Sequence, residues 1–100
     1  SIADVLTKAD DTTKYFMITG EITSIANAIY GNLYLKAGDS EIYVYGCYPG
    51  FGATGDFRKN LLATKGIKVG DKLTVIGTKS SYNAVPQLAN GIYFSHESAQ

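Results

Sequence analysis

A segment near the C-terminal end constrains the fold of this chain more than any other. Val69–Leu88 reads VGDKLTVIGTKSSYNAVPQL. After a Gly-Asp turn, apolar and polar residues alternate, as in a strand with one buried face. The alternation passes through Gly77 to the pair Tyr82 and Asn83, and residues 86–88 open a second strand. The segment therefore predicts a β-hairpin and favours a fold built from antiparallel strands.

The rest of the chain predicts three more strands and two short helices. Many β-formers with frequent glycine favour an all-β domain over a helical bundle. The resulting β-β-β-α-β-β order is that of the OB-fold. We predict one domain over residues 1–100: an all-β, five-stranded OB-fold Greek-key barrel with an N-terminal helix and a short helix between strands three and four. The expected elements are helix Ser1–Ala9, strands Lys14–Asn27, Tyr30–Lys36 and Glu41–Cys47, helix Phe57–Lys65, and strands Lys72–Lys79 and Gln87–Ser95.

The first strand carries two expected irregularities. Phe16, Ile18 and Ile22 alternate with polar residues and are expected to point inward. Gly20 interrupts this inward row, which in a small barrel marks a bend where one strand serves two parts of the sheet. Ile25 breaks the alternation, which predicts a bulge.

Composition narrows the function classes. Nine basic and nine acidic residues give a net charge of zero, so the chain has no basic footprint of the kind most nucleic-acid binders carry. Cys47 is the only cysteine, and it reads as an inert strand-end thiol. No apolar run approaches the length of a membrane span. No signal peptide is present, but the chain begins at Ser1 without methionine, so a trimmed product is compatible with the sequence.

Several motifs together resemble a known family. They are the first-strand pattern of residues 16–23, the strand pair of residues 31–36 and 42–46, and the closing run from Val69 to Leu88. From about Lys14 to Tyr93 the chain resembles bacterial OB-fold domains of the nucleic-acid-binding lipoprotein type. The resemblance implies a nucleic-acid-binding function and an exported location, in the periplasm or at the cell surface. A cytoplasmic location stays open.

Outward tyrosines form the strongest candidate site. Tyr34, Tyr43 and Tyr45 fall on the outer face of strands two and three, where opposite side chains lie about 4.5–5.5 Å apart. OB-fold domains bind ligands on this face, and aromatic rings stack nucleic-acid bases. Lys36 and Lys79 are expected near the rim as phosphate contacts. The alternatives are sugar or protein contacts, or ordinary strand packing.

The loop Ser80–Val85 joins the last two strands and is expected to close over one end of the ligand groove. Tyr82 is a candidate for ligand stacking. Asn83 fits a local turn role better than a ligand role.

A glycine-rich segment after the third strand matches a cofactor motif only superficially. Residues 50–55 read GFGATG, which fits G-x-G-x-x-G. That fingerprint needs a parallel βαβ unit, whereas the neighbouring strands here belong to hairpins. A loop that needs glycine conformations is the better interpretation, and no cofactor is expected.

Catalytic constellations are missing from the sequence. His96 is the only histidine, in a tail (His96–Gln100) that is expected to fray, and Asp10 and Asp11 form the only adjacent carboxylate pair. No metal-ligand spacing and no nucleophile elbow occur. We therefore expect no enzyme and no metal site. The predicted function is a non-enzymatic module that binds single-stranded nucleic acid, and the alternative is a protein- or carbohydrate-interaction accessory domain of an exported protein. The oligomeric state is left open.

Overall fold

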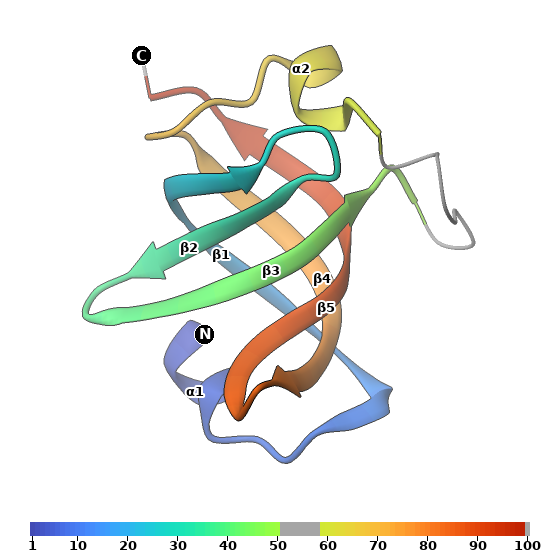
Figure 1. Ribbon diagram of the computed structural model, residues 1–100. Helices are drawn as coiled ribbons and strands as arrows, with labels where there is room; N and C mark the ends of the chain where they lie inside the picture. Colours follow the sequence, from blue (N-terminus) through green and yellow to red (C-terminus); the bar gives the residue numbers. More distant parts are fainter. Residues whose placement is uncertain (51–58, 100) are drawn as a thin grey trace.

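The computed structural model describes residues 1–50 and 59–99 and contains a mostly β fold, a five-stranded sheet that closes into a ring (Figure 1). A short helix precedes the strands and another lies between β3 and β4, as predicted. The elements are α1 (Ile2–Leu6), β1 (Asp11–Asn27), β2 (Asn32–Ala37), β3 (Ser40–Tyr48), α2 (Leu61–Lys65), β4 (Lys72–Tyr82) and β5 (Val85–Glu97).

The strands follow the order β1-β2-β3-β5-β4 around the ring, and β4 returns to β1. Neighbours are antiparallel except β3 and β5, which run parallel. β1 closes the ring because its first part pairs with β4 and its last part with β2, the change falling at Glu21. Directly before it, a Cβ on Gly20 would lie 2.9 Å from the Lys36 carbonyl oxygen. The expectation that one strand serves two parts of the sheet near Gly20 is confirmed.

The bulge expected near Ile25 is also confirmed. The register between β1 and β2 shifts between Ile22 and Ser24 and again between Ile25 and Asn27. These shifts turn Ile25 toward the core, against which it packs half-buried. A bulge inserts an extra residue and sharpens the local bend, which helps a sheet of few strands to close.

The core fills the inside of the ring with aliphatic side chains from every strand, and α1 covers one end. Ser1 caps α1 by accepting a hydrogen bond from the Asp4 backbone N–H, and Ile2 and Val5 of α1 are buried. The helix is shorter than expected because the Thr7 hydroxyl and N–H both bond to the Asp4 carbonyl, which closes the last turn. The largest fully buried aliphatic side chains of the described strands are Ile18, Ile22, Leu33, Leu35, Ile42, Val44, Leu73, Val75 and Leu88.

α2 occupies only the last part of the predicted helix. It runs from Leu61 to Lys65, and Gly66, with a φ of 68°, forms a left-handed C-cap, a common role for glycine. Leu61 and Leu62 are buried against the core. The predicted start of the helix, at residues 57 and 58, lies outside the described residues.

β4 and β5 form a longer hairpin than predicted. Tyr82 pairs with Val85, so the connection is the two-residue turn Asn83-Ala84 and not a loop of six residues. Both turn residues have positive φ, 51° and 65°, as a type I′ turn requires. Asn83 thus has the turn role predicted for it. Ala84 is an unusual residue in this conformation, because among L-residues it is mainly Asn and Asp, besides glycine, that adopt it.

Replacing Ala84 by glycine is therefore expected to stabilise the fold. The left-handed conformation costs a residue with a Cβ about 1–2 kcal/mol, and glycine escapes this cost while losing some chain entropy on folding. We expect Ala84→Gly to raise the free energy of unfolding by about 0.5–1 kcal/mol in urea denaturation. Ala89→Gly, at a position that is not in the positive-φ region, should lower it. A loss of stability in Ala84→Gly would contradict the account of this turn.

The C-terminal tail does not fray within the described residues, so that prediction is wrong. β5 continues to Glu97, and the Ala99 N–H donates to the buried Asp71 carboxylate at 3.0 Å. Asp71 also accepts from the Lys68 N–H, and these backbone hydrogen bonds hold the pKa of its carboxyl below the usual value. His96 is half-buried and lies 2.8 Å from the Tyr93 hydroxyl through Nδ1. The tail is thus joined to the barrel by tertiary contacts.

Candidate binding groove

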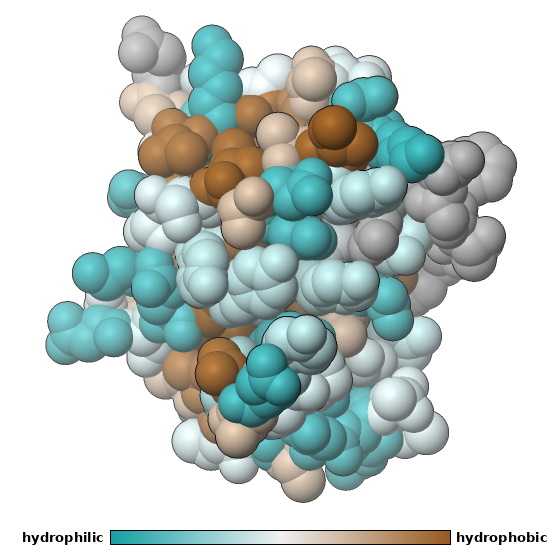
Figure 2. All heavy atoms as spheres, in the orientation of Figure 1, coloured by the Kyte–Doolittle hydropathy of each residue, from teal (hydrophilic) through white to brown (hydrophobic). Residues whose placement is uncertain are grey.

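A row of side chains crosses the outside of the barrel over four strands. Tyr34 on β2 pairs with Tyr43 on β3, Tyr43 pairs with Gln87 on β5, and Gln87 pairs with Ser80 on β4. Paired residues project from the same face of a sheet. The alternation in the sequence predicted that Tyr34 and Tyr43 point outward. The same outer face continues onto β5 and β4, which the sequence patterns did not place beside these tyrosines. Figure 2 shows a pale band of weakly hydrophilic residues across β2 and β3.

The tyrosines on this face lie close together. The rings of Tyr34 and Tyr43 have their centroids 5.0 Å apart, with their planes tilted by 58°. Tyr34 is 37% exposed, Tyr45 41% and Tyr82 69%, while Tyr43 between them is half-buried. Rings at this distance and tilt attract each other, so the pair forms a firm surface while part of each ring stays open to solvent.

Two adjoining hollows lie on this face. One, of about 380 Å³, is lined by Tyr34, Tyr43, Tyr82 and Gln87 together with Ala26, Asn83 and Val85. The other, of about 510 Å³, is lined by Tyr43, Tyr45, Tyr82 and Gln87. Because they share three residues, we treat them as one site. The tyrosine groove is defined here as Ala26, Tyr34, Tyr43, Tyr45, Tyr82, Asn83, Val85 and Gln87.

The structure thus brings together the four tyrosines that the sequence predicted as site residues. Sequence reasoning missed Gln87, Val85 and Ala26, and it gave Asn83 only a turn role. Gln87 is the most informative omission, because it pairs with Tyr43 and its Nε2 donates a hydrogen bond to the Ser80 hydroxyl at 3.1 Å. The alternation within β5 could have indicated the direction of Gln87. Leu88 is buried, so the neighbouring Gln87 faces outward.

Neither predicted lysine lines the tyrosine groove. Lys36 is exposed on β2, as expected, but it pairs in register with Glu41 on β3 and Glu21 on β1. Lys79 is only 4% exposed, and its Nζ lies 2.6 Å from Asp10 Oδ1. The expected exposure of Lys79 at the rim is therefore wrong.

The reason is the inward direction of this part of β4. Leu73, Val75 and Gly77 are buried, and Lys79 continues the same row at the same spacing. Its ammonium group reaches the half-exposed Asp10, which precedes β1. A buried ammonium group needs such a carboxylate partner, so Lys79 has a structural role.

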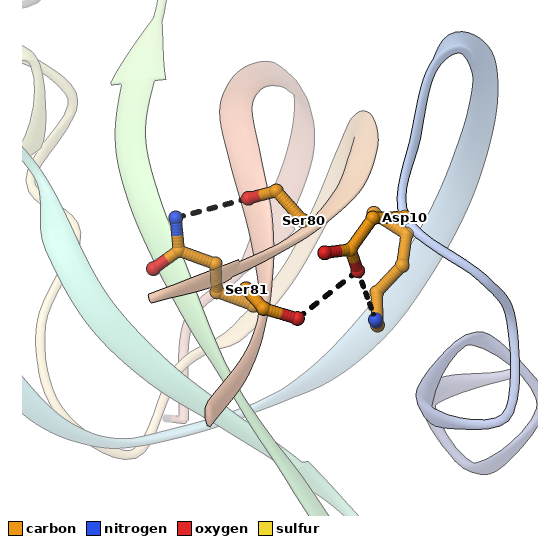
Figure 3. A network of polar contacts seen from close by, with 5 residues as sticks. Asp10, Ser80 and Ser81 are labelled. Atoms are coloured by element: carbon orange, nitrogen blue, oxygen red, sulfur yellow. Dashed lines mark hydrogen bonds and ion pairs between the residues drawn. The ribbon is translucent and has the colours of Figure 1, made fainter. Parts of the chain in front are cut away.

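A small polar network surrounds this ion pair (Figure 3). Asp10 Oδ1 accepts hydrogen bonds from Lys79 Nζ and, at 3.0 Å, from the Ser81 hydroxyl. The hydrogen bond from Lys79, followed by that from Ser81, lowers the pKa of the Asp10 carboxyl below its usual value. The adjacent residue Ser80 bonds to Gln87. Successive β4 residues thus connect this network and the tyrosine groove.

This network makes the stability of the fold depend on pH in a defined range. A carboxyl whose pKa is lower in the folded state than in the unfolded chain stabilises the fold fully at pH values above its unfolded-state pKa, about 4. This contribution is lost as the pH falls through the folded-state pKa. Asp10→Asn should therefore be less stable than the unchanged chain at neutral pH, and the difference should shrink in acid. Urea midpoints near pH 7 and near pH 2.5 measure this. A difference that is equal at both values would contradict it.

Within the part of the chain that the structure describes, Cys47 and the residue types that bind metals form no further site. Cys47 is buried, and burial raises the pKa of its thiol to about 12, so it is a poor nucleophile. Within residues 1–50 and 59–99, no three His, Cys, Asp or Glu side chains gather as a metal site would require. The glycine-rich segment, from Phe51 to Gly55, lies outside the described residues.

No family model matches the chain, and no curated protein matches it either. Among the described residues, none of the helices has the length and apolar character needed to cross a bilayer. Inference about function therefore starts from the geometry of the tyrosine groove.

Proposed function

We propose that this chain is an OB-fold domain that acts as a non-enzymatic binding module, with the tyrosine groove as its ligand site. The supporting observation is that two adjoining hollows share Tyr43, Tyr82 and Gln87. OB-folds bind ligands on the face of strands two and three, together with the loops between strands one and two and strands four and five. The tyrosine groove combines that face with the β4–β5 turn.

Single-stranded nucleic acid is the first candidate ligand. Four tyrosines offer ring faces on which bases could stack, at about 1–3 kcal/mol per base. The sequence resemblance to nucleic-acid-binding domains supports the same ligand and an exported location. However, the described residues that line the groove carry no formal charge, so phosphates would find few partners among them. Binding of an oligonucleotide would be weak and would depend little on salt.

A protein or carbohydrate ligand is the second candidate, and the position of the lysines favours it. Lys79 is paired with Asp10, and Lys36 lies in register with Glu21 and Glu41 on the neighbouring strands. Tyrosine suits ligands that are partly apolar and partly polar, because its ring is apolar and its hydroxyl forms hydrogen bonds. An accessory domain of an exported protein would use such a surface.

Backbone amide shifts in NMR titrations test the proposed function. Three probes cover the candidate classes: a short oligothymidylate, a mixture of neutral hexasaccharides and a proline-rich peptide. The proposal expects at least one probe to shift the amides of Tyr43, Tyr82 and Gln87, which lie on three strands. Shifts confined to α1 and the outer face of β1, or no shift with any of the three probes, would contradict the proposal.

A further inference from the structure

We propose that the ligand of the tyrosine groove is an uncharged oligosaccharide whose hydroxyl groups are recognised by Gln87. This inference rests on the proposed function and narrows it to one class of ligand. It is carried by three features of the described residues: the neutral lining of the groove, the fixed amide of Gln87 and the closed ring of strands.

The first feature is charge. Among the described residues, the lining consists of four tyrosines, two side-chain amides and two small aliphatic residues, none of which carries a formal charge. A nucleic-acid ligand brings a negative charge at every phosphate, and its affinity comes largely from lysine and arginine. Two lysines lie near the groove residues in sequence. Lys79 forms an ion pair with Asp10, and Lys36 lies in register with Glu21 and Glu41 on the neighbouring strands. A neutral ligand needs no lysine or arginine in the groove.

The second feature is Gln87. It lies in both hollows, between Tyr43 on β3 and Ser80 on β4. The hydrogen bond from Nε2 to the Ser80 hydroxyl fixes the direction of the amide, so its Oε1 is a preset acceptor. A preset polar group loses little entropy on binding. It also favours ligands with hydroxyl groups, because a ligand without them would bury the acceptor unpaired.

The tilt of the tyrosine rings agrees with a sugar chain. Consecutive stacked bases present parallel planes, whereas the Tyr34 and Tyr43 planes are tilted by 58°. Successive pyranose rings of an oligosaccharide turn relative to one another about the glycosidic bonds. Each could rest an apolar C–H face on one tyrosine while its hydroxyl groups point toward Gln87. Such mostly apolar sites with a few placed polar groups are typical of small-ligand pockets.

The third feature separates a sugar from an extended peptide. Peptides commonly bind a sheet by adding a strand to an open edge. In the groove, Tyr34, Tyr43 and Gln87 each pair with residues on both neighbouring strands, so the strands offer no open edge at these three positions. A peptide would have to bind through side chains alone, without the main-chain hydrogen bonds that give strand addition its affinity.

The test uses the whole chain and separate titrations with cellohexaose, xylohexaose, laminarihexaose, maltohexaose and N-acetylchitohexaose. The inference expects at least one of them to shift the Tyr43, Tyr82 and Gln87 amides, with an affinity that stays constant as salt rises from about 50 to 200 mM. Gln87→Ala should weaken binding about tenfold, as loss of a hydrogen bond to a ligand hydroxyl implies. Phe94→Ala, an exposed aromatic position outside the groove, should leave the affinity unchanged.

Failure of this inference is distinguishable from failure of the proposed function. If no hexasaccharide binds, but the oligothymidylate or the proline-rich peptide shifts the groove amides, the inference is overturned and the groove remains a binding site. If a hexasaccharide binds equally well to Gln87→Ala, the role of Gln87 is overturned. If none of the probes shifts the groove amides, both proposals fall. Circular dichroism of each variant establishes that it is folded before its affinity is compared.

Discussion

Replacing Tyr43 by alanine is expected to lower the affinity for a groove ligand by about 10- to 100-fold. Tyr43 lines both hollows and contacts the ring of Tyr34, so its removal takes away a ligand surface and the support of its neighbour. One aromatic stacking contact contributes about 1–3 kcal/mol, and central aromatic residues commonly dominate a binding site. The measurement is a titration by NMR or calorimetry with whichever hexasaccharide binds most tightly.

Two variants show whether the loss comes from the ring. Tyr43→Phe keeps the ring and should retain the affinity within a few-fold. Phe94→Ala removes an aromatic ring that is 58% exposed outside the groove and should change nothing. If Tyr43→Ala loses stability but binds as tightly as the unchanged chain, the tyrosines on this face are packing residues and not a ligand surface.

Replacing Gly31 by alanine is expected to lower the free energy of unfolding by about 3 kcal/mol. Gly31 precedes β2 with a φ of 75°, and a Cβ there would lie 2.8 Å from the Cβ of buried Cys47. The left-handed backbone costs a residue with a Cβ about 1–2 kcal/mol. Overpacking of the core adds about 1–3 kcal/mol. Urea denaturation followed by circular dichroism measures the sum.

Gly38→Ala is the matched control for this substitution. Gly38 lies in the turn between β2 and β3 with a φ of 61°, and a Cβ there would meet no atom within 4 Å. Its replacement should therefore cost only the backbone strain, about 1 kcal/mol. The difference between the two variants isolates the contact with Cys47. Equal losses in both variants would contradict the packing described at the start of β2.

Much of the fold follows from local patterns in the sequence. Strict alternation in the first strand predicts that Ile18 and Ile22 are buried, and Gly20 and Ile25 mark the bend and the bulge. These features are local consequences of strand geometry and of the missing Cβ. The ring-closed sheet, the N-terminal helix and the helix before β4 were predicted from the order of the elements.

The errors have two different physical causes. The direction of Lys79 was contained in the sequence, since Leu73, Val75 and Gly77 define an inward row that includes it, but its charge suggested the surface. The attachment of the tail was not contained there, because the bond from Ala99 to Asp71 depends on how distant segments meet. Gln87 reaches the tyrosines only through the parallel pairing of β3 and β5, which hairpin patterns do not reveal.

The most direct test of the tyrosine groove as the ligand site is the position of a bound hexasaccharide relative to the tyrosine rings. Intermolecular nuclear Overhauser effects between sugar C–H protons and tyrosine ring protons report contacts within about the range of van der Waals packing. The account predicts such effects to Tyr34, Tyr43, Tyr45 and Tyr82, which line the two hollows. Effects to Tyr15 or Phe94 on other parts of the barrel, with none to these four rings, would contradict it.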